Sequence, residues 1–306
     1  MSNINIKEKL DDLRSDNTSG ANELIDKALE IIKIRLELIE DPNDDIKGDL
    51  FNLAKKIINS RPSMAPLINT IGFLLHDLEK ITKKNLEQRI NQFYVDRTER
   101  EKALAQAFRT FLTIKKMTAP KIMLISYSST ILNQLIENKD YNFEIYILES
   151  RPLLEGIRVA ETLSSYFKTN LIIDAAMGKF IDEIDSILIG VDSVLKDGSI
   201  INKIGTFPLA VLGYERNIDV YAVGDLFKYN LKSHFGKEVV IEEKPIKELY
   251  SEESQKEFLK IHNYYFDITP SKYITGIISD LGVLKIEEFL KLTKENLPIE
   301  WFEEFL

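Results

Sequence analysis

The spacing of hydrophobic residues predicts helices in the first third of the chain. Between residues 21 and 40, leucine, isoleucine and alanine recur every three or four positions, which places them on one helical face. The same spacing returns at 50–58, in a segment from about Ser63 to Ile81, and in a charged stretch at about 85–112. Pro42 and Pro62 interrupt the pattern. Four helices with short breaks indicate a helical bundle.

A different pattern follows Pro120. Short apolar runs occupy residues 121–126, 143–148, 170–174, 186–191 and 220–223, with helix-like segments at 155–167 and 207–216. Strands that alternate with helices predict a parallel, doubly wound sheet. We therefore expect an α/β protein in which an α-helical N-terminal domain, residues 1–117, precedes a Rossmann-like domain, residues 118–306. The charged residues 237–256 look like a solvated excursion with a short strand at 239–241.

Polar residues gather where the predicted strands end. Right-handed crossovers bring the carboxyl ends of parallel strands to one edge of the sheet, where ligands bind. In residues 190–206 a strand ends at Asp192, Asp197-Gly198 forms a turn, and Asn202-Lys203 precede a helix start at Gly205-Thr206. This segment offers an anion an amide, an ammonium group and free backbone N–H groups. An ordinary strand–turn–helix connection is the alternative interpretation.

Composition and charge narrow the function classes. The chain has 306 residues, 44% of them hydrophobic and 29% charged, which is typical of globular proteins. A net charge of −9 argues against direct nucleic-acid binding. The apolar runs are short and the first residues are polar, so we expect no membrane segment, no signal peptide and a cytoplasmic location. With no cysteine and three scattered histidines, we expect no metal site and no cofactor.

Several separated motifs carry a family resemblance. Residues 190–206 read Gly-Val-Asp-Ser-Val-Leu-Lys-Asp-Gly-Ser-Ile-Ile-Asn-Lys-Ile-Gly-Thr, and further motifs lie at 19–21, 61–67, 149–152, 227–228 and 266–270. Together they resemble the initiation factor 2B alpha/beta/delta family, which includes ribose-1,5-bisphosphate isomerase and methylthioribose-1-phosphate isomerase. The resemblance covers nearly the whole chain, and it is specific because the motifs follow the order of the family.

The resemblance implies two catalytic positions. In the isomerases of this family a cysteine takes a proton from a phosphorylated aldose and an aspartate returns one. The aspartate matches Asp192, and the place of the cysteine falls on Ser128. A serine hydroxyl needs an adjacent base to act, and residues 126–130 contain none. Ser128 is therefore either a remnant of the catalytic position or a strand-end hydroxyl that bonds to the backbone.

The same motifs predict an anion-binding cradle. Its candidate residues are Ser19, Gly20 and Ala21 at a helix start, the cations Arg61, Lys203 and Lys228, and Asn202. Such a cradle suits a sugar phosphate or a nucleoside monophosphate. Two alternatives remain open, because Ser19 can cap its helix and Arg61 can pair with an acid. Glu149 and Arg151 belong either to the pocket wall or to a salt-bridged strand end.

Two function classes follow. The favoured one is a non-catalytic regulatory protein resembling the alpha subunit of initiation factor 2B, with a ligand in a relic isomerase pocket and the alpha subunit of initiation factor 2 as a candidate partner. Serines in place of the cysteine motif favour it. The alternative is an aldose–ketose isomerase of phosphorylated pentoses, which the retained Asp192 favours. The resemblance and the apolar segments 274–284 and 301–306 predict a homodimer or larger even-numbered oligomer.

Overall fold

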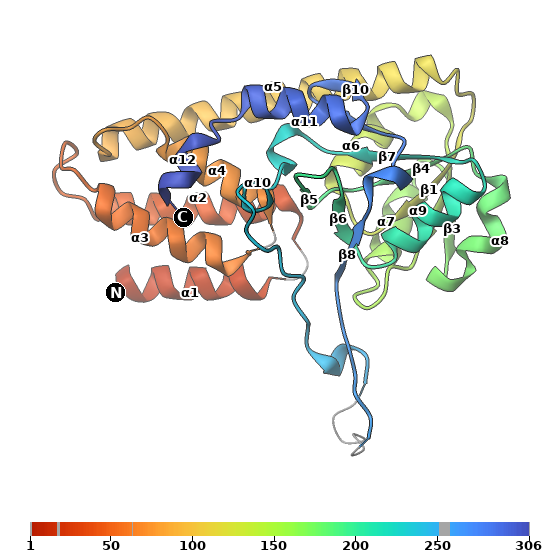
Figure 1. Cartoon of the computed structure of the whole chain (residues 1–306), viewed down its shortest axis with the longest axis horizontal. Helices are drawn as coiled ribbons and strands as arrows, with labels where there is room; N and C mark the ends of the chain where they lie inside the picture. The colour runs from red at the N-terminus through yellow and green to blue at the C-terminus, as the bar shows by residue number, and fades with distance from the viewer. Residues whose placement is uncertain (1, 17–18, 63, 251–257, 306) are drawn as a thin grey trace.

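A computed structural model describes residues 2–16, 19–62, 64–250 and 258–305. The N-terminal helices gather beside a mostly parallel sheet (Figure 1). The N-terminal helices are α1 Ser2–Ser15, α2 Ala21–Glu37, α3 Lys47–Ser60, α4 Ala65–Leu75 and α5 Lys83–Ile114. Among the described residues, no helix combines the length and apolar content that crossing a membrane requires.

The helix predictions are confirmed in number and position for α2 to α5, with two differences. Helix α1 was not predicted, because its largely polar sequence offers little hydrophobic periodicity, although Leu13 is fully buried. The segment expected to reach Ile81 ends at Leu75, because His76 is extended and Asp77 turns the chain with φ 54°. Its expected start, Ser63, lies outside the described residues.

The long helix α5 takes part in two hydrophobic cores. Its first half, with Ile90 and Phe93, packs in the core of the helical region, and its second half, with Phe108 and Phe111, packs under the sheet. The helical core also includes residues from 226–231 and 297–302, so it is not continuous in sequence. The division into domains at 117/118 therefore stays a prediction.

The C-terminal helix α12 Glu300–Phe305 packs against α4 (Figure 1). Gly72 permits this, because a Cβ atom there would lie 2.1 Å from the Trp301 ring. Trp301 is 9% exposed and Phe302 1%. We expected these residues to offer apolar surface to a partner, which is wrong, since the chain buries them in its own core. Leu306 lies outside the described residues.

The main sheet has seven strands in the order β10-β9-β7-β4-β1-β2-β3, of which only β10 is antiparallel. They are β1 Lys121–Ile125, β2 Glu144–Leu148, β3 Lys168–Ile172, β4 Ser186–Ile189, β7 Asp219–Val223, β9 Gly276–Ser279 and β10 Gly282–Leu284. Further helices are α6 Ser129–Glu137, α7 Glu155–Leu163, α8 Met177–Phe180, α9 Thr206–Glu215, α10 Leu231–His234 and α11 Ile286–Asn296, of which α10 packs against α4. The predicted doubly wound fold is confirmed, and its strand order reverses between β1 and β4.

A small antiparallel sheet follows the strand β4. It contains β5 Ser193–Val194, β6 Ile200–Lys203 and β8 Phe266–Thr269 in the order β5-β6-β8. The expected turn at Asp197-Gly198 is present, with Gly198 at φ 82°, but it joins two strands, so Asn202 and Lys203 lie on a strand and not in a loop.

Between α10 and β8 the chain forms an arm that extends from the body (Figure 1). The described part of this arm coincides with the expected solvated excursion. Residues 251–257 lie outside the described residues. No strand forms at 239–241, so that expectation is wrong.

Candidate functional site

A cavity of about 690 Å³ opens at the carboxyl ends of β1 and β4, where the strand order reverses. Open α/β sheets bind ligands at this position. Most of the predicted site residues line the cavity, whatever their role: Ser19, Gly20, Ala21, Arg61, Ser128, Asp192, Asn202, Lys203 and Lys228. The structure therefore brings together residues that lie far apart in the sequence.

Glu149 and Arg151 are not among the lining residues. The backbone N–H groups of Ser150 and Arg151 each donate to the Asp174 carboxylate at 2.8 Å, and Arg151 is exposed. This loop is therefore held against the end of β3 and away from the cavity wall.

Ser128 is the N-cap residue of α6. Its Oγ accepts a hydrogen bond from the Ile131 N–H at 3.3 Å. A Cβ atom at Gly190 would lie 3.3 Å from both Asn202 Oδ1 and Ser128 Cβ, so this glycine lets the two side chains approach the end of β4. Within the described part of the chain, Ser128 Oγ has no bond to a side-chain base. The geometry matches the interpretation of a strand-end hydroxyl bonded to the backbone.

Asp192 brings a protonatable carboxyl group to the cavity. Burial raises its pKa, while the charges of Lys228 and Lys203 lower it and that of Glu155 raises it further. Among the described residues no hydrogen bond or ion pair engages its carboxylate. A carboxyl group with a raised pKa that faces a cavity is suited to donating a proton.

Lys203 is already paired. Its Nζ lies 2.6 Å from Glu155 Oε1 and 5.2 Å from the centre of the Tyr265 ring. Neighbouring Asn202 donates from Nδ2 to Thr206 Oγ1 at 3.0 Å. We did not predict Glu155 as a site residue. The sequence feature that could have identified Glu155 is its position at the start of the predicted helix that follows the predicted strand 143–148.

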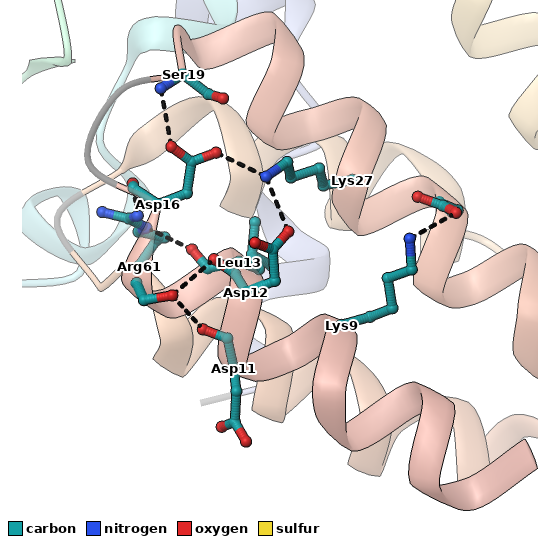
Figure 2. A network of polar contacts seen from close by, with 10 residues as sticks. Lys9, Asp11, Asp12, Leu13, Asp16, Ser19, Lys27 and Arg61 are labelled. Atoms are coloured by element: carbon teal, nitrogen blue, oxygen red, sulfur yellow. Dashed lines mark hydrogen bonds and ion pairs between the residues drawn. The ribbon is translucent and has the colours of Figure 1, made fainter. Parts of the chain in front are cut away.

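Arg61 binds backbone carbonyl groups, and no acidic side chain in the described part of the chain forms an ion pair with it. Its Nε donates to Leu13 O at 2.8 Å and its Nη2 donates to Asp16 O, both at the end of α1 (Figure 2). Burial lowers the pKa of Arg61, and the Asp16 charge opposes this. Figure 2 also shows the Asp16 carboxylate accepting from the Ser19 N–H at 2.9 Å and pairing with Lys27 at 2.7 Å.

Two helix starts meet at the cavity. The N-cap of α2 is Gly20, which has no side-chain cap bond, so the alternative in which Ser19 caps this helix is wrong. A Cβ atom on Gly20 would lie 3.6 Å from Ser129 Oγ, at the start of α6. At the start of α6 the Ile131 N–H is already bonded to Ser128, so the N–H groups left for an anion are those of Ser129 and Thr130 and those of the first turn of α2.

A third helix start is closed to ligands. The Asp267 carboxylate on β8 accepts from the N–H groups of Gly205 at 2.8 Å and Phe207 at 3.1 Å, at the start of α9. Burial raises the pKa of Asp267 to about 6, although the backbone N–H groups lower it. We expected the helix start at Gly205-Thr206 to bind an anionic ligand. This is wrong, because the Asp267 carboxylate of the chain itself occupies that helix start.

The fold and the cavity define a Rossmann-like α/β protein with an N-terminal helical region and a polar pocket at the strand ends. The chain matches the Initiation factor 2 subunit family over residues 17–286, and it belongs to this family. The sequence resemblance is thereby confirmed.

The relatives carry two kinds of name. A putative translation initiation factor eIF-2B subunit 2-like protein of Pyrococcus furiosus is 29% identical, over 90% of this chain and 94% of its own length. A ribose 1,5-bisphosphate isomerase of Archaeoglobus fulgidus is 27% identical, over 98% and 96%. The crystal structure of a Pyrococcus horikoshii translation initiation factor eIF-2B matches with a TM-score of 0.79 and 26% identity, over 92% of this chain and 97% of that one. The family thus contains both translation factors and sugar-phosphate isomerases.

Proposed function

We propose that the chain is a regulatory protein of the initiation factor 2B alpha type that binds a sugar phosphate or a nucleoside monophosphate in the cavity. The observation that carries this proposal is the convergence of the α2 and α6 starts at Gly20 and Ser129. A phosphate group there would accept backbone N–H bonds from both helices. Lys228 would add charge, since no carboxylate of the described residues pairs with it.

Ser128 argues against efficient catalysis. Its oxygen caps α6, and a hydroxyl without a base cannot replace the thiolate that the family's isomerases use. One observation favours the alternative, an isomerase of phosphorylated pentoses, because the raised pKa of Asp192 suits a proton donor. We therefore keep isomerase activity as the second candidate function.

Ligand binding is tested by calorimetry with ribose 5-phosphate and adenosine monophosphate. For whichever of the two ligands binds the wild type, Lys228→Ala should lower the affinity by roughly tenfold to a hundredfold. This is the scale for losing a hydrogen bond to a charged group. Lys291→Ala is the control, since this exposed lysine on α11 does not line the cavity. Equal affinity of wild type and Lys228→Ala would place the ligand elsewhere.

Turnover separates the two function classes. The wild type should convert phosphorylated pentoses very slowly or not at all. Ser128→Cys should give detectable isomerisation, and adding Asp192→Asn should abolish that gain while ligand binding persists. Fast wild-type turnover that requires Asp192 and is indifferent to Ser128→Ala would establish the isomerase instead.

The proposed role needs protein partners. We propose a homodimer or larger even-numbered oligomer in the cytoplasm, with the alpha subunit of initiation factor 2 as partner and with no direct nucleic-acid contact. Light scattering at micromolar concentration should detect the oligomer, and a purely monomeric species would contradict it. Co-sedimentation with purified initiation factor 2 tests the partner.

A further inference from the structure

The wall of the cavity has no excess of cations. Among the described residues that line it, seven side chains are lysine or arginine and seven are aspartate or glutamate. A bisphosphate brings about four negative charges at neutral pH, because the second pKa of a phosphate ester is near 6. A site built for two phosphate groups would therefore need more basic than acidic side chains.

Most of these cations are already engaged within the protein. Arg61 binds two carbonyl groups, and four others lie within 2.6 to 3.6 Å of a carboxylate: Arg100, Lys102, Lys203 and Lys244. This leaves Lys228 and Arg158, neither of which has an acidic partner among the described residues. Arg158 lies over the Tyr127 ring at 4.5 Å. The charge that remains suits one phosphate group beside the two helix starts.

The pair of Lys203 and Glu155 is fixed in place. The two side chains are only 5% and 18% exposed, and Glu155 Oε1 also accepts from Ser126 Oγ at 2.8 Å. Ser126 itself and Leu154, the residue before Glu155, have left-handed φ angles of 68° and 59°. Such backbone costs energy and persists only where its surroundings hold it. Lys203 is therefore not free to swing toward a ligand phosphate.

Glu155 also carries an acceptor without a donor. Its Oε2 is buried and has no hydrogen-bond partner among the described residues. A buried acceptor without a partner costs free energy, which a donor from a ligand would recover. A sugar hydroxyl can donate to this oxygen, whereas a phosphate dianion cannot.

We infer that the cavity selects a ligand with a single phosphate group, and that Glu155 is the residue that excludes a second one. This inference rests on the proposed ligand-binding function. A second phosphate next to Lys203 would find that ammonium neutralised and would face the carboxylate of Glu155. A free hydroxyl at the same place would bind Glu155 Oε2.

The test compares ligands on the wild type by calorimetry at constant ionic strength. The tighter of ribose 1-phosphate and ribose 5-phosphate should bind at least about tenfold more tightly than ribose 1,5-bisphosphate, the scale of one unfavourable charge contact. Glu155→Gln should raise affinity for the bisphosphate by about tenfold and change affinity for the monophosphate by less than about threefold, because it frees the Lys203 ammonium. Glu161→Gln is the matched control, an exposed glutamate on the same helix that makes the same change of charge away from the cavity.

The outcomes separate this inference from the proposed function. If the wild type binds the bisphosphate as tightly as either monophosphate, the cavity binds ligands but the inference is wrong. If neither the three sugar phosphates nor adenosine monophosphate binds, both are wrong. The wild-type comparison needs no variant, so it decides whether the cavity selects a single phosphate even if Glu155→Gln fails to fold. Equal effects of Glu155→Gln and Glu161→Gln on bisphosphate affinity would show that Glu155 is not the excluding residue.

Discussion

The helix starts of α2 and α9 look alike in sequence and differ in the structure. Each begins after a glycine, Gly20 or Gly205, and neither has a cap bond from its own N-cap side chain. The start of α9 receives the Asp267 carboxylate, whereas no carboxylate of the described residues bonds to the first N–H groups of α2, which faces the cavity. A helix start is a ligand site only where the fold leaves its N–H groups free.

The largest effect is expected from removing the internal anion. Asp267→Ala should lower the free energy of unfolding by about 2 kcal/mol, because two N–H groups at the start of α9 lose their acceptor. Urea denaturation measures the change. Asp267→Asn should cost less, since its amide oxygen can still accept. Because Asp267 does not line the cavity, ligand affinity should stay the same. An unchanged urea midpoint for Asp267→Ala would mean that α9 does not depend on this cap.

A smaller loss is expected at the start of α6. Ser128→Ala should destabilise the protein by about 1 kcal/mol, because the Ile131 N–H loses the hydroxyl that caps it. Ser129→Ala is the control, since no hydrogen bond of the Ser129 hydroxyl is present in the described structure. Equal denaturation curves for the two variants would show that Ser128 does not act as a cap, and would revive a chemical role for its hydroxyl.

Substitution at Gly20, the N-cap of α2, should change stability little but weaken ligand binding. Gly20 has φ −72°, and an added Cβ would make only ordinary contacts of 3.6 and 3.7 Å. Gly20→Ala should therefore cost roughly 0.5 kcal/mol of stability, the scale of exchanging alanine for glycine at an N-cap. Its methyl group would stand between the starts of α2 and α6, so affinity for a sugar phosphate should fall. Unchanged affinity would argue against a phosphate between these helices.

The last prediction concerns the pH dependence of stability. The pKa of Asp267 is raised to about 6 by burial, above the value of about 4 expected in the unfolded chain. The folded protein therefore binds more protons than the unfolded one between pH 4 and pH 6, and the contribution of Asp267 to stability falls as pH rises through this window. Denaturation series should show this slope in the wild type and a shallower one in Asp267→Asn. Parallel slopes would contradict the raised pKa.

Patterns in the amino-acid sequence predicted most of the helices and strands and the edge of the sheet that carries the cavity. Hydrophobic periodicity is a local property, so it located α2 to α5 and the strands β1 and β4, and the crossover rule then placed Ser128 and Asp192 at one edge. The family motifs added Gly20, Lys203 and Lys228, which the structure brings to the same cavity.

Tertiary packing determines which groups are available to a ligand. Asp267 bonds to Gly205 across 62 residues of chain, Glu155 neutralises Lys203, and Trp301 packs over Gly72. No local pattern encodes these contacts, because each depends on how separate elements pack. Propensity and periodicity specify which residues lie at a site, but pairing between distant residues fixes whether a cation, a carboxylate or a helix start remains free to bind.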